Sequence, residues 1–233
     1  MFMILPSMVR IASFVVGNRL ITILSRLIPL LVLSPFTASA NGFTDWRDGD
    51  LVFQDSAGSQ SAAIRLATNS PYTHMGIVRL TSSGPMVIEA ARTVSETPLA
   101  TFLARAEQGR YAVYRLREVA PAALTKAVAQ ARRYIGRPYD IFFRLRPDAI
   151  YCSELPYYAF KEAGIPIGKA ERFGTLGIAN PAVKALFTKR WRQHPDCQDT
   201  DKAGCWQHMQ SQLIVSPASI AADPQMLQVF SSF

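Results

Sequence analysis

The segment Tyr151-Cys152-Ser153-Glu154-Leu155 opens an amphipathic stretch that ends at Gly164-Ile165-Pro166, which predicts a helix with Cys152 at its head. Unpaired backbone N–H groups and the positive end of the helix dipole favour the thiolate form of a cysteine at such a position. Because the thiolate is the nucleophile, the placement suggests covalent catalysis. A cysteine among apolar residues can equally be a small buried hydrophobe. A catalytic role for Cys152 therefore also needs a base and a group that orients the base, and the cellular compartment decides whether a free thiol is expected.

The first 40 residues indicate the compartment. They contain Arg10, Arg19 and Arg26 but no acidic residue, and an apolar run at 27–33 precedes the small-residue triplet 38–40. This order is typical of a secretory signal peptide. A transmembrane anchor would need about 18 apolar residues with few charges, and the arginines interrupt the apolar stretches before that. We expect residues 1–40 to be a signal peptide cleaved after Ala40, and the protein to be periplasmic or secreted.

The mature chain would be a single domain of residues 41–233. All 17 acidic residues and 22 of the 25 lysines and arginines lie in it, so its formal net charge is +5 instead of +8. This charge could suit an anionic cell-wall polymer or a lipid headgroup surface, with possible peripheral association, or could simply maintain solubility. The sequence has no dense basic run and no nucleic-acid motif, so we expect no nucleic-acid partner.

Hydrophobic patterning predicts a domain of the α+β class. Strands and helices do not alternate regularly, which argues against a parallel sheet built from βαβ units. The segment 213–230 is expected to form loop and a short helix. The expected strands are 50–53, 74–80, 86–91 and 111–116, and the expected helices are 59–67, 98–108, 121–135, the one headed by Cys152, and 180–192.

His74 and Glu89 are the candidates for the base and its orienting group. His74 lies on a predicted core strand, and histidine is suited to accept a thiol proton near neutral pH. Glu89 is an isolated carboxylate among small apolar residues on the next strand. A hairpin places the two on neighbouring strands, within hydrogen-bonding reach if they share a face. Alternatively, His74 is a satisfied core histidine and Glu89 pairs with Arg79 or Arg92.

Several motifs together resemble the YiiX-type permuted papain-like proteins, a circularly permuted branch of the NlpC-type cysteine peptidases. The resemblance runs from about Gly49 to Asn180-Pro181 and returns at 215–217. The motifs occur in family order: Gly49-Asp50-Leu51-Val52-Phe53, Tyr72-Thr73-His74-x-Gly76, Glu89-Ala90, Gly136-Arg137-Pro138-Tyr139-Asp140 and Tyr151-Cys152-Ser153-Glu154.

The resemblance implies a papain-like fold, with a mixed or antiparallel sheet packed against helices, and assigns the site residues. Cys152 would be the nucleophile, His74 the base and Glu89 the orienting carboxylate, with no metal or cofactor. Tyr139 would help to bind the oxyanion or the substrate, or be a wall residue with its hydroxyl in water. Gln60 and Thr73 would line the cleft, or serve as a helix cap and a strand-surface residue.

Residues 192–209 do not match the family pattern and are expected to be an insertion. They contain His194-x-x-Cys197 and Cys205-x-x-His208. The two cysteines could form a disulfide in an oxidising compartment, which would leave Cys152 as the single free thiol. The alternative is a tetrahedral zinc site made by the two histidines and two cysteines. Export favours the disulfide.

The expected activity is that of an exported cysteine hydrolase that cleaves an amide bond. The relatives suggest a peptidase acting on cell-wall (peptidoglycan) peptides. An amidase or deacylase acting on lipid or N-acyl substrates is the alternative within the enzyme class. A non-catalytic cell-wall binding module of the same fold is the alternative outside it, and the joint presence of Cys152, His74 and Glu89 argues against it.

Overall fold

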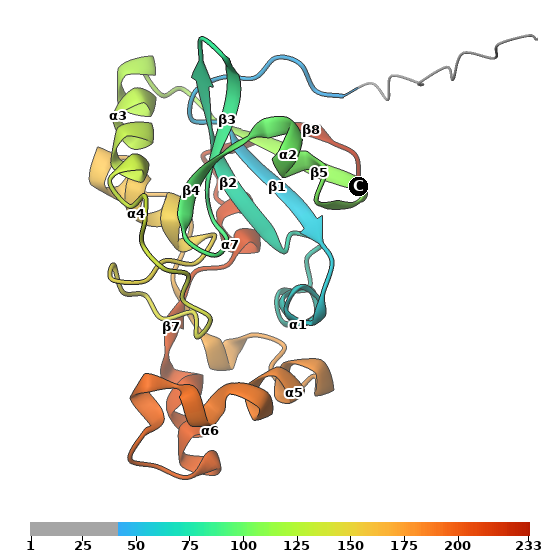
Figure 1. Ribbon diagram of the computed structural model, residues 1–233, viewed down its shortest axis with the longest axis vertical. Helices are drawn as coiled ribbons and strands as arrows, with labels where there is room; N and C mark the ends of the chain where they lie inside the picture. Colours follow the sequence, from blue (N-terminus) through green and yellow to red (C-terminus); the bar gives the residue numbers. More distant parts are fainter. Residues whose placement is uncertain (1–41) are drawn as a thin grey trace, which may run out of the picture. The chain divides into compact units, whose positions relative to one another are not determined.

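The structure is a computed structural model that describes residues 42–233. Its centre is a six-stranded sheet in the order β4-β3-β2-β1-β5-β8, in which every neighbouring pair is antiparallel (Figure 1). The predicted signal peptide and its cleavage site lie outside the described residues. The strands of this sheet are β1 (Leu51–Ser56), β2 (His74–Thr81), β3 (Gly84–Ala90), β4 (Val94–Pro98), β5 (Ala106–Leu116) and β8 (Met226–Ser231).

Helices cover both faces of the sheet. Along β1, Leu51 and Phe53 face a core formed with α3 (Pro121–Arg132) and α4 (Glu154–Ala163). The alternate residue Val52 faces a second core, completed by α2 (Leu99–Leu103). Successive side chains of a strand point to opposite faces, so a continuous apolar run such as 51–53 indicates a strand buried on both sides. Figure 1 shows α3 and α4 side by side along one flank of the sheet.

The ends of α3 and α4 follow from local chemistry. Pro121 occupies the first turn of α3, where its missing N–H has no helical partner to lose. Gly164 ends α4 with a φ of 89°, a left-handed conformation that glycine adopts without steric cost. The α4 helix therefore has a fixed length, and the turn at its N-terminal end carries Cys152.

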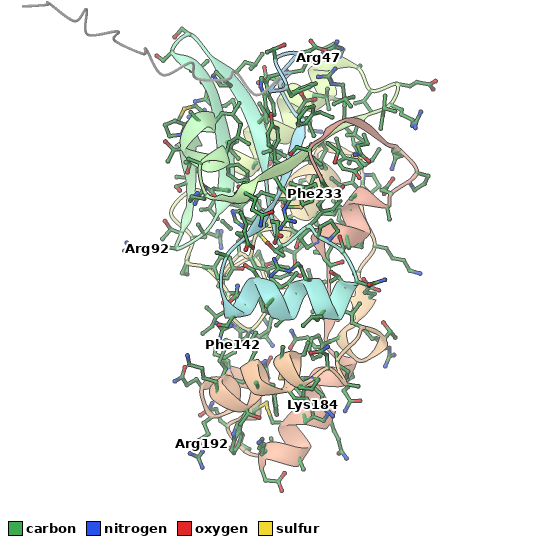
Figure 2. The ribbon with its side chains drawn as sticks, turned by 90° about the vertical axis from the view of Figure 1, so that its right-hand side faces the viewer. Arg47, Arg92, Phe142, Lys184, Arg192 and Phe233 are labelled. Atoms are coloured by element: carbon green, nitrogen blue, oxygen red, sulfur yellow. A yellow bond between two sulfur atoms is a disulfide. The ribbon has the colours of Figure 1, made fainter. Side chains whose placement is uncertain are left out.

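A smaller, mainly helical region follows α4 in the chain. It contains α5 (Pro181–Arg190) and α6 (Lys202–Ser211), with the short 3₁₀ segments η2 (Trp191–Gln193) and η3 (Pro195–Cys197) between them. Cys197 and Cys205 form a disulfide that joins η3 to α6. The helix α1 (Ser59–Thr68) contacts α5 and lies between the sheet and this region (Figure 2).

The remaining elements are short. The turn η1 (Phe173–Thr175) follows β6 (Glu171–Arg172), which pairs with β7 (Leu213–Ile214) in a separate two-stranded ribbon. The helix α7 (Pro217–Ala221) begins with a capping box between Ser216 and Ser219. Within residues 42–233 no helix combines the length and the apolar character that a membrane span requires.

The predicted α+β class and the four predicted strands are confirmed. The predicted helix 98–108 is wrong beyond Leu103, because β5 already begins at Ala106. In β5, Gln108 and Gly109 both have positive φ, and residues 107–110 bulge out between the pairs Ala106–Ser56 and Tyr111–Gln54. The strand therefore continues through the glycine that the sequence pattern indicated as a helix stop.

Two strands and two helix ends also differ from prediction. β4 was not predicted, because its only buried residue is Val94 and the strand gives a weak pattern. The segment 213–230 contains the short helix α7 as expected, but it also supplies β8, whose exposed Leu227 breaks the usual alternation. The α3 and α5 helices end at Arg132 and Arg190, with turns and 3₁₀ geometry in place of their predicted last residues.

Candidate active site

Cys152 lies in the turn that leads into α4 and is almost completely buried. Two contacts with Val215 hold this turn. The hydroxyl of Tyr151 accepts a hydrogen bond from the Val215 N–H at 2.9 Å, and the Ser153 hydroxyl donates to the Val215 carbonyl at 2.8 Å. Within the described part of the chain, the backbone N–H of Cys152 has no acceptor. This N–H is therefore free to bind an oxygen of a bound group at the thiol.

The strand register brings His74 and Glu89 together. Ile77 pairs with Ile88, so Glu89 lies opposite Gly76, and both share a face with His74. Gly76 is required at this point, because a Cβ there would clash with Val87 Cγ1 and lie 2.9 Å from the Ile88 carbonyl oxygen. The missing side chain avoids these contacts and lets β2 and β3 approach closely beside His74, with the Cβ of Glu89 3.3 Å from where a Cβ of residue 76 would lie.

His74 and Glu89 form a short hydrogen bond of 2.6 Å between Nε2 and Oε2. The imidazole also stacks on the Phe102 ring, with the centroids 5.6 Å apart. Since Nε2 is occupied by Glu89, Nδ1 is the nitrogen available to the thiol of Cys152. The ring is thus fixed by a carboxylate on one side and an aromatic surface beneath it.

His74 and Glu89 each favour the charged form of the other. Burial by itself would lower the pKa of His74, but hydrogen bonds and charge from Cys152 and Glu89 raise it to about 9. Burial by itself would raise the pKa of Glu89, but His74 lowers it to about 2. At neutral pH, Glu89 is therefore a carboxylate and His74 an imidazolium.

Arg105, which no sequence pattern indicated, is the second partner of Glu89. Its guanidinium donates to Oε1 of Glu89 and lies over the Phe102 ring, 5.3 Å from the centroid. The alternative partner Arg79 instead forms a bidentate pair with Glu96. Arg105 follows α2 in a segment predicted to be uninterrupted helix, so its position gave no signal of a role beside Glu89.

The three other predicted residues divide into two groups. Tyr139 lies close enough to Cys152 for the thiol to contribute, after burial, to raising the pKa of Tyr139 well above its usual value. Its hydroxyl accepts a hydrogen bond of 3.2 Å from Gln60 Nε2. Thr73 is buried, and its hydroxyl accepts from the Ser56 N–H at 2.7 Å. Thr73 thus connects β1 to the start of β2. Gln60, Thr73 and Tyr139 are not among the residues that line the pocket described next.

A pocket opens at Cys152. Its walls are mostly aliphatic and aromatic. Phe142, which lines it, lies beside α1 in Figure 2. The lining comes from α1 (63, 64, 67 and 68), the loop 141–143, the Cys152 turn, the segment 173–176, α5 and the residues that follow it (183–194), Met209 and the segment 212–217.

The disulfide occupies both cysteines of the predicted insertion. Cys197 and Cys205 are buried with Phe187 and bonded to each other, so they cannot serve as thiolate ligands of zinc. Of the two histidines in the alternative zinc site, His194 is buried in the pocket wall and His208 is exposed. Among residues 42–233, no three histidine, cysteine or carboxylate side chains converge in a way that would hold a metal ion.

Known proteins share this architecture. The sequence model of the family described as "permuted papain-like amidase enzyme, YaeF/YiiX, C92 family" matches residues 45–230. The uncharacterized protein YiiX of Escherichia coli K12 is 31% identical over 202 residues, which cover 86% of this chain and 94% of YiiX. A crystal structure titled "metalloprotein yiiX" from E. coli O157:H7 superposes with a TM-score of 0.71 at 31% identity, covering 80% of this chain and 98% of that one. The fold is thus the predicted permuted papain-like one, and the chain belongs to the YaeF/YiiX family of permuted papain-like amidases.

Proposed function

We propose that this amidase is a thiol hydrolase in which Cys152, His74 and Glu89 act together. The observation that supports it most strongly is the 2.6 Å bond between His74 and Glu89 beside a buried free cysteine. The carboxylate fixes the ring and stabilises the imidazolium, as the third member of a catalytic triad does. A binding module would not need a charged imidazole held against a thiol.

The proposed reaction proceeds through an acyl-enzyme. The Cys152 thiolate attacks the amide carbonyl carbon, and the carbonyl oxygen becomes an oxyanion bound by the Cys152 N–H and the Tyr139 hydroxyl. The C–N bond then breaks, and the His74 imidazolium gives its proton to the leaving amine. A water molecule, deprotonated by His74, attacks the thioester, which releases a carboxylic acid and regenerates the Cys152 thiolate and the His74 imidazolium.

The pocket favours an acyl chain as the substrate group bound next to the scissile amide. Its lining includes Ile64, Val183, Leu186 and Phe187, which offer no partners to the polar groups of a cell-wall peptide. An aliphatic chain would replace water along these walls. We therefore propose an N-acyl amide or an amide-linked lipid as substrate, in preference to a cell-wall peptide.

Chain-length dependence tests this substrate class. We expect kcat/KM for fatty acyl p-nitroanilides to rise with chain length, by up to about fourfold per methylene if each is fully buried. Leu186→Glu should remove that dependence, whereas Leu227→Glu, at an exposed site on β8, should not. Cys152→Ala should be inactive on every chain length. Cleavage of purified muropeptides without cleavage of any acyl amide would instead make the enzyme a cell-wall peptidase.

We also propose export, with cleavage after Ala40. The charge and apolar pattern of residues 1–40 supports this proposal. Cell fractionation followed by intact mass measurement should recover a protein that begins at Asn41 outside the cytoplasm. A cytoplasmic protein that keeps residues 1–40 would contradict it.

The proposed mechanism uses no metal ion. The related E. coli structure is titled a metalloprotein, but the donor set needed for a metal site does not converge among residues 42–233. The residues of this chain therefore do not fit a protein-held metal at the proposed site, and no step is assigned to one.

A further inference from the structure

Arg190 is an unusual residue for the wall of an apolar pocket. It lies at the end of α5, is partly buried, and forms no ion pair with a carboxylate in the described part of the chain. Its Nη1 donates to the Ile141 carbonyl at 3.0 Å, and its Nη2 donates to Gln60 Oε1 at 2.9 Å. Burying a charge here has a desolvation cost. These two hydrogen bonds are the contacts that offset it.

Arg190 fixes the orientation of the Gln60 side-chain amide. A guanidinium can only donate hydrogen bonds, so the group that faces it must be the amide oxygen. The amide NH₂ then faces the other way, toward Tyr139, and donates to its hydroxyl at 3.2 Å. Without the arginine, the two ends of the amide could exchange places.

The orientation of Gln60 in turn fixes the role of Tyr139. Because the phenolic oxygen accepts from Gln60, the hydroxyl hydrogen must point elsewhere. Cys152 is close enough to contribute, after burial, to raising the pKa of Tyr139. With its oxygen engaged by Gln60, Tyr139 has its hydrogen available on the Cys152 side, where the proposed reaction forms negative charge on the thiolate and then on the oxyanion.

We propose that Arg190 is a positioning residue that sets the direction of an Arg190–Gln60–Tyr139 hydrogen-bond relay, so that Tyr139 donates to the reacting centre. The inference rests on the proposed function of Cys152. It adds to that function a reason why the wall of the same pocket carries Arg190, a cation that pairs with no carboxylate among residues 42–233. It also gives Gln60 a role in orienting Tyr139 and not in contacting the substrate.

Gln60→Glu tests the direction of the relay with almost no change of shape. A carboxylate still accepts from Arg190, but its second oxygen can also only accept, so Tyr139 must donate to it and withdraw its hydrogen from Cys152. We expect kcat to fall by about 10²-fold, the usual effect of losing one oxyanion donor, with KM little changed. Tyr139→Phe should lower kcat to the same extent.

The double variant Q60E/Y139F should be no slower than either single variant, because both remove the same hydrogen bond. A purely structural role for Gln60 predicts a different result, since the carboxylate of the Q60E variant would keep its bond to Arg190 and kcat would stay near that of the wild type. Wild-type kcat in Q60E, or effects that multiply in the double variant, would overturn the relay. Circular dichroism and the melting temperature establish that each variant is folded.

Arg190 itself is tested with a matched neighbour. Arg190→Met should lower kcat by about tenfold or more, because Gln60 can then turn and accept from Tyr139. Arg190→Lys, which still donates, should recover part of the loss. Lys189→Met removes the same charge from an exposed position on α5 and should leave kcat unchanged. Equal effects at 189 and 190 would reduce the role of Arg190 to one of net charge and overturn the proposal.

The rate of alkylation of Cys152 by iodoacetamide at pH 6 separates failure of the relay from failure of the proposed function. Q60E and Y139F should slow alkylation equally, whether or not a good substrate is known. If Cys152 of the wild type does not react and cleaves no amide, the proposed function fails. If the wild type reacts and Q60E reacts as fast, the relay alone fails.

Discussion

His74 lies at the start of β2 between Cys152 and Glu89, whereas His194 lies between η2 and η3 in the wall of the pocket, and both are largely buried. Cys152 and Glu89 overcome the effect of burial and raise the pKa of His74 to about 9. For His194, burial outweighs the nearby Asp196 and lowers the pKa. Burial alone therefore does not decide whether a histidine is charged, and a direct carboxylate partner does.

The two surroundings suit two tasks. The His74 region holds charges in fixed positions with short hydrogen bonds from three separate elements. The His194 ring lies in the pocket wall against Phe142, and its Nδ1 accepts from the Asp196 N–H at 3.2 Å. The first arrangement has the groups for proton transfer, and the second belongs to a mostly aliphatic and aromatic wall.

Replacing His74 should separate the two regions most clearly. His74→Ala should lower kcat by about 10³-fold or more, since it removes both the proposed base and the proposed acid. Binding of a fatty acid to the pocket should change little, as measured by calorimetry with the inactive variant. Loss of fatty-acid binding together with activity would show that the two regions are not independent.

Removal of the disulfide should affect the pocket and leave the chemistry at His74 unchanged. Changing both Cys197 and Cys205 to Ala should lower the free energy of unfolding by about 2–3 kcal/mol, as expected for a bridge between residues eight apart. It should also raise KM for long acyl chains, because α5 and α6 support the pocket wall. Urea denaturation and chain-length kinetics measure both effects. A fall in kcat on short-chain substrates would contradict the separation.

The pH dependence should come from His74. Activity should fall about tenfold per pH unit as pH rises through about 9, where the imidazolium loses the proton that it is proposed to give to the leaving group. His194→Phe should leave the alkaline limb of the pH–rate profile unchanged. A shift of that limb in this variant would show that His194, and not His74, causes it.

The folding stability contributed by His74 is fully present below pH 6.5 and is lost as pH rises through about 9. For Glu89 the contribution is present above pH 4.5 and is lost as pH falls through about 2.

A pH-dependent effect on stability alone is expected at Glu154, in the first turn of α4. Its side chain is fully buried, and burial raises its pKa to about 9, so it is protonated at neutral pH. Because the unfolded chain loses this proton near pH 4.5, folding stability falls as pH rises from there toward 9. Glu154→Gln keeps an acceptor for the Tyr151 N–H and should lie within about 1 kcal/mol of the wild type at pH 5. At pH 8 the variant should be the more stable protein, and equal melting temperatures at both pH values would contradict this.

The sequence could predict the His74 region because that region is built from local patterns. A hairpin, a helix start and a glycine two residues after the histidine are short-range signals, and each keeps its meaning without the rest of the fold. Motif order added the permuted papain-like topology. These signals were enough to place His74 and Glu89 on neighbouring strands of one hairpin.

The pocket and the two arginines could not be predicted in this way. Arg105 and Arg190 reach their partners from segments 16 and 130 residues away along the chain, and nothing in their surroundings distinguishes them from other surface arginines. The pocket wall is assembled from several segments, and its shape depends on how α5 packs against α1. Strand β8 could not be predicted for a related reason. It is a strand because it pairs with β5, whereas its own sequence has only a weak strand pattern.

Gly76 has a consequence for protein engineering. The position that most restricts the geometry between His74 and Glu89 has no functional group, so a survey that removes side chains one at a time would pass over it. A design that transplants this pair onto another antiparallel hairpin has to carry three positions: the histidine, the glycine two residues later, and the glutamate directly opposite that glycine. A graft of the two functional side chains alone would place a Cβ against the side chain and backbone of the facing strand.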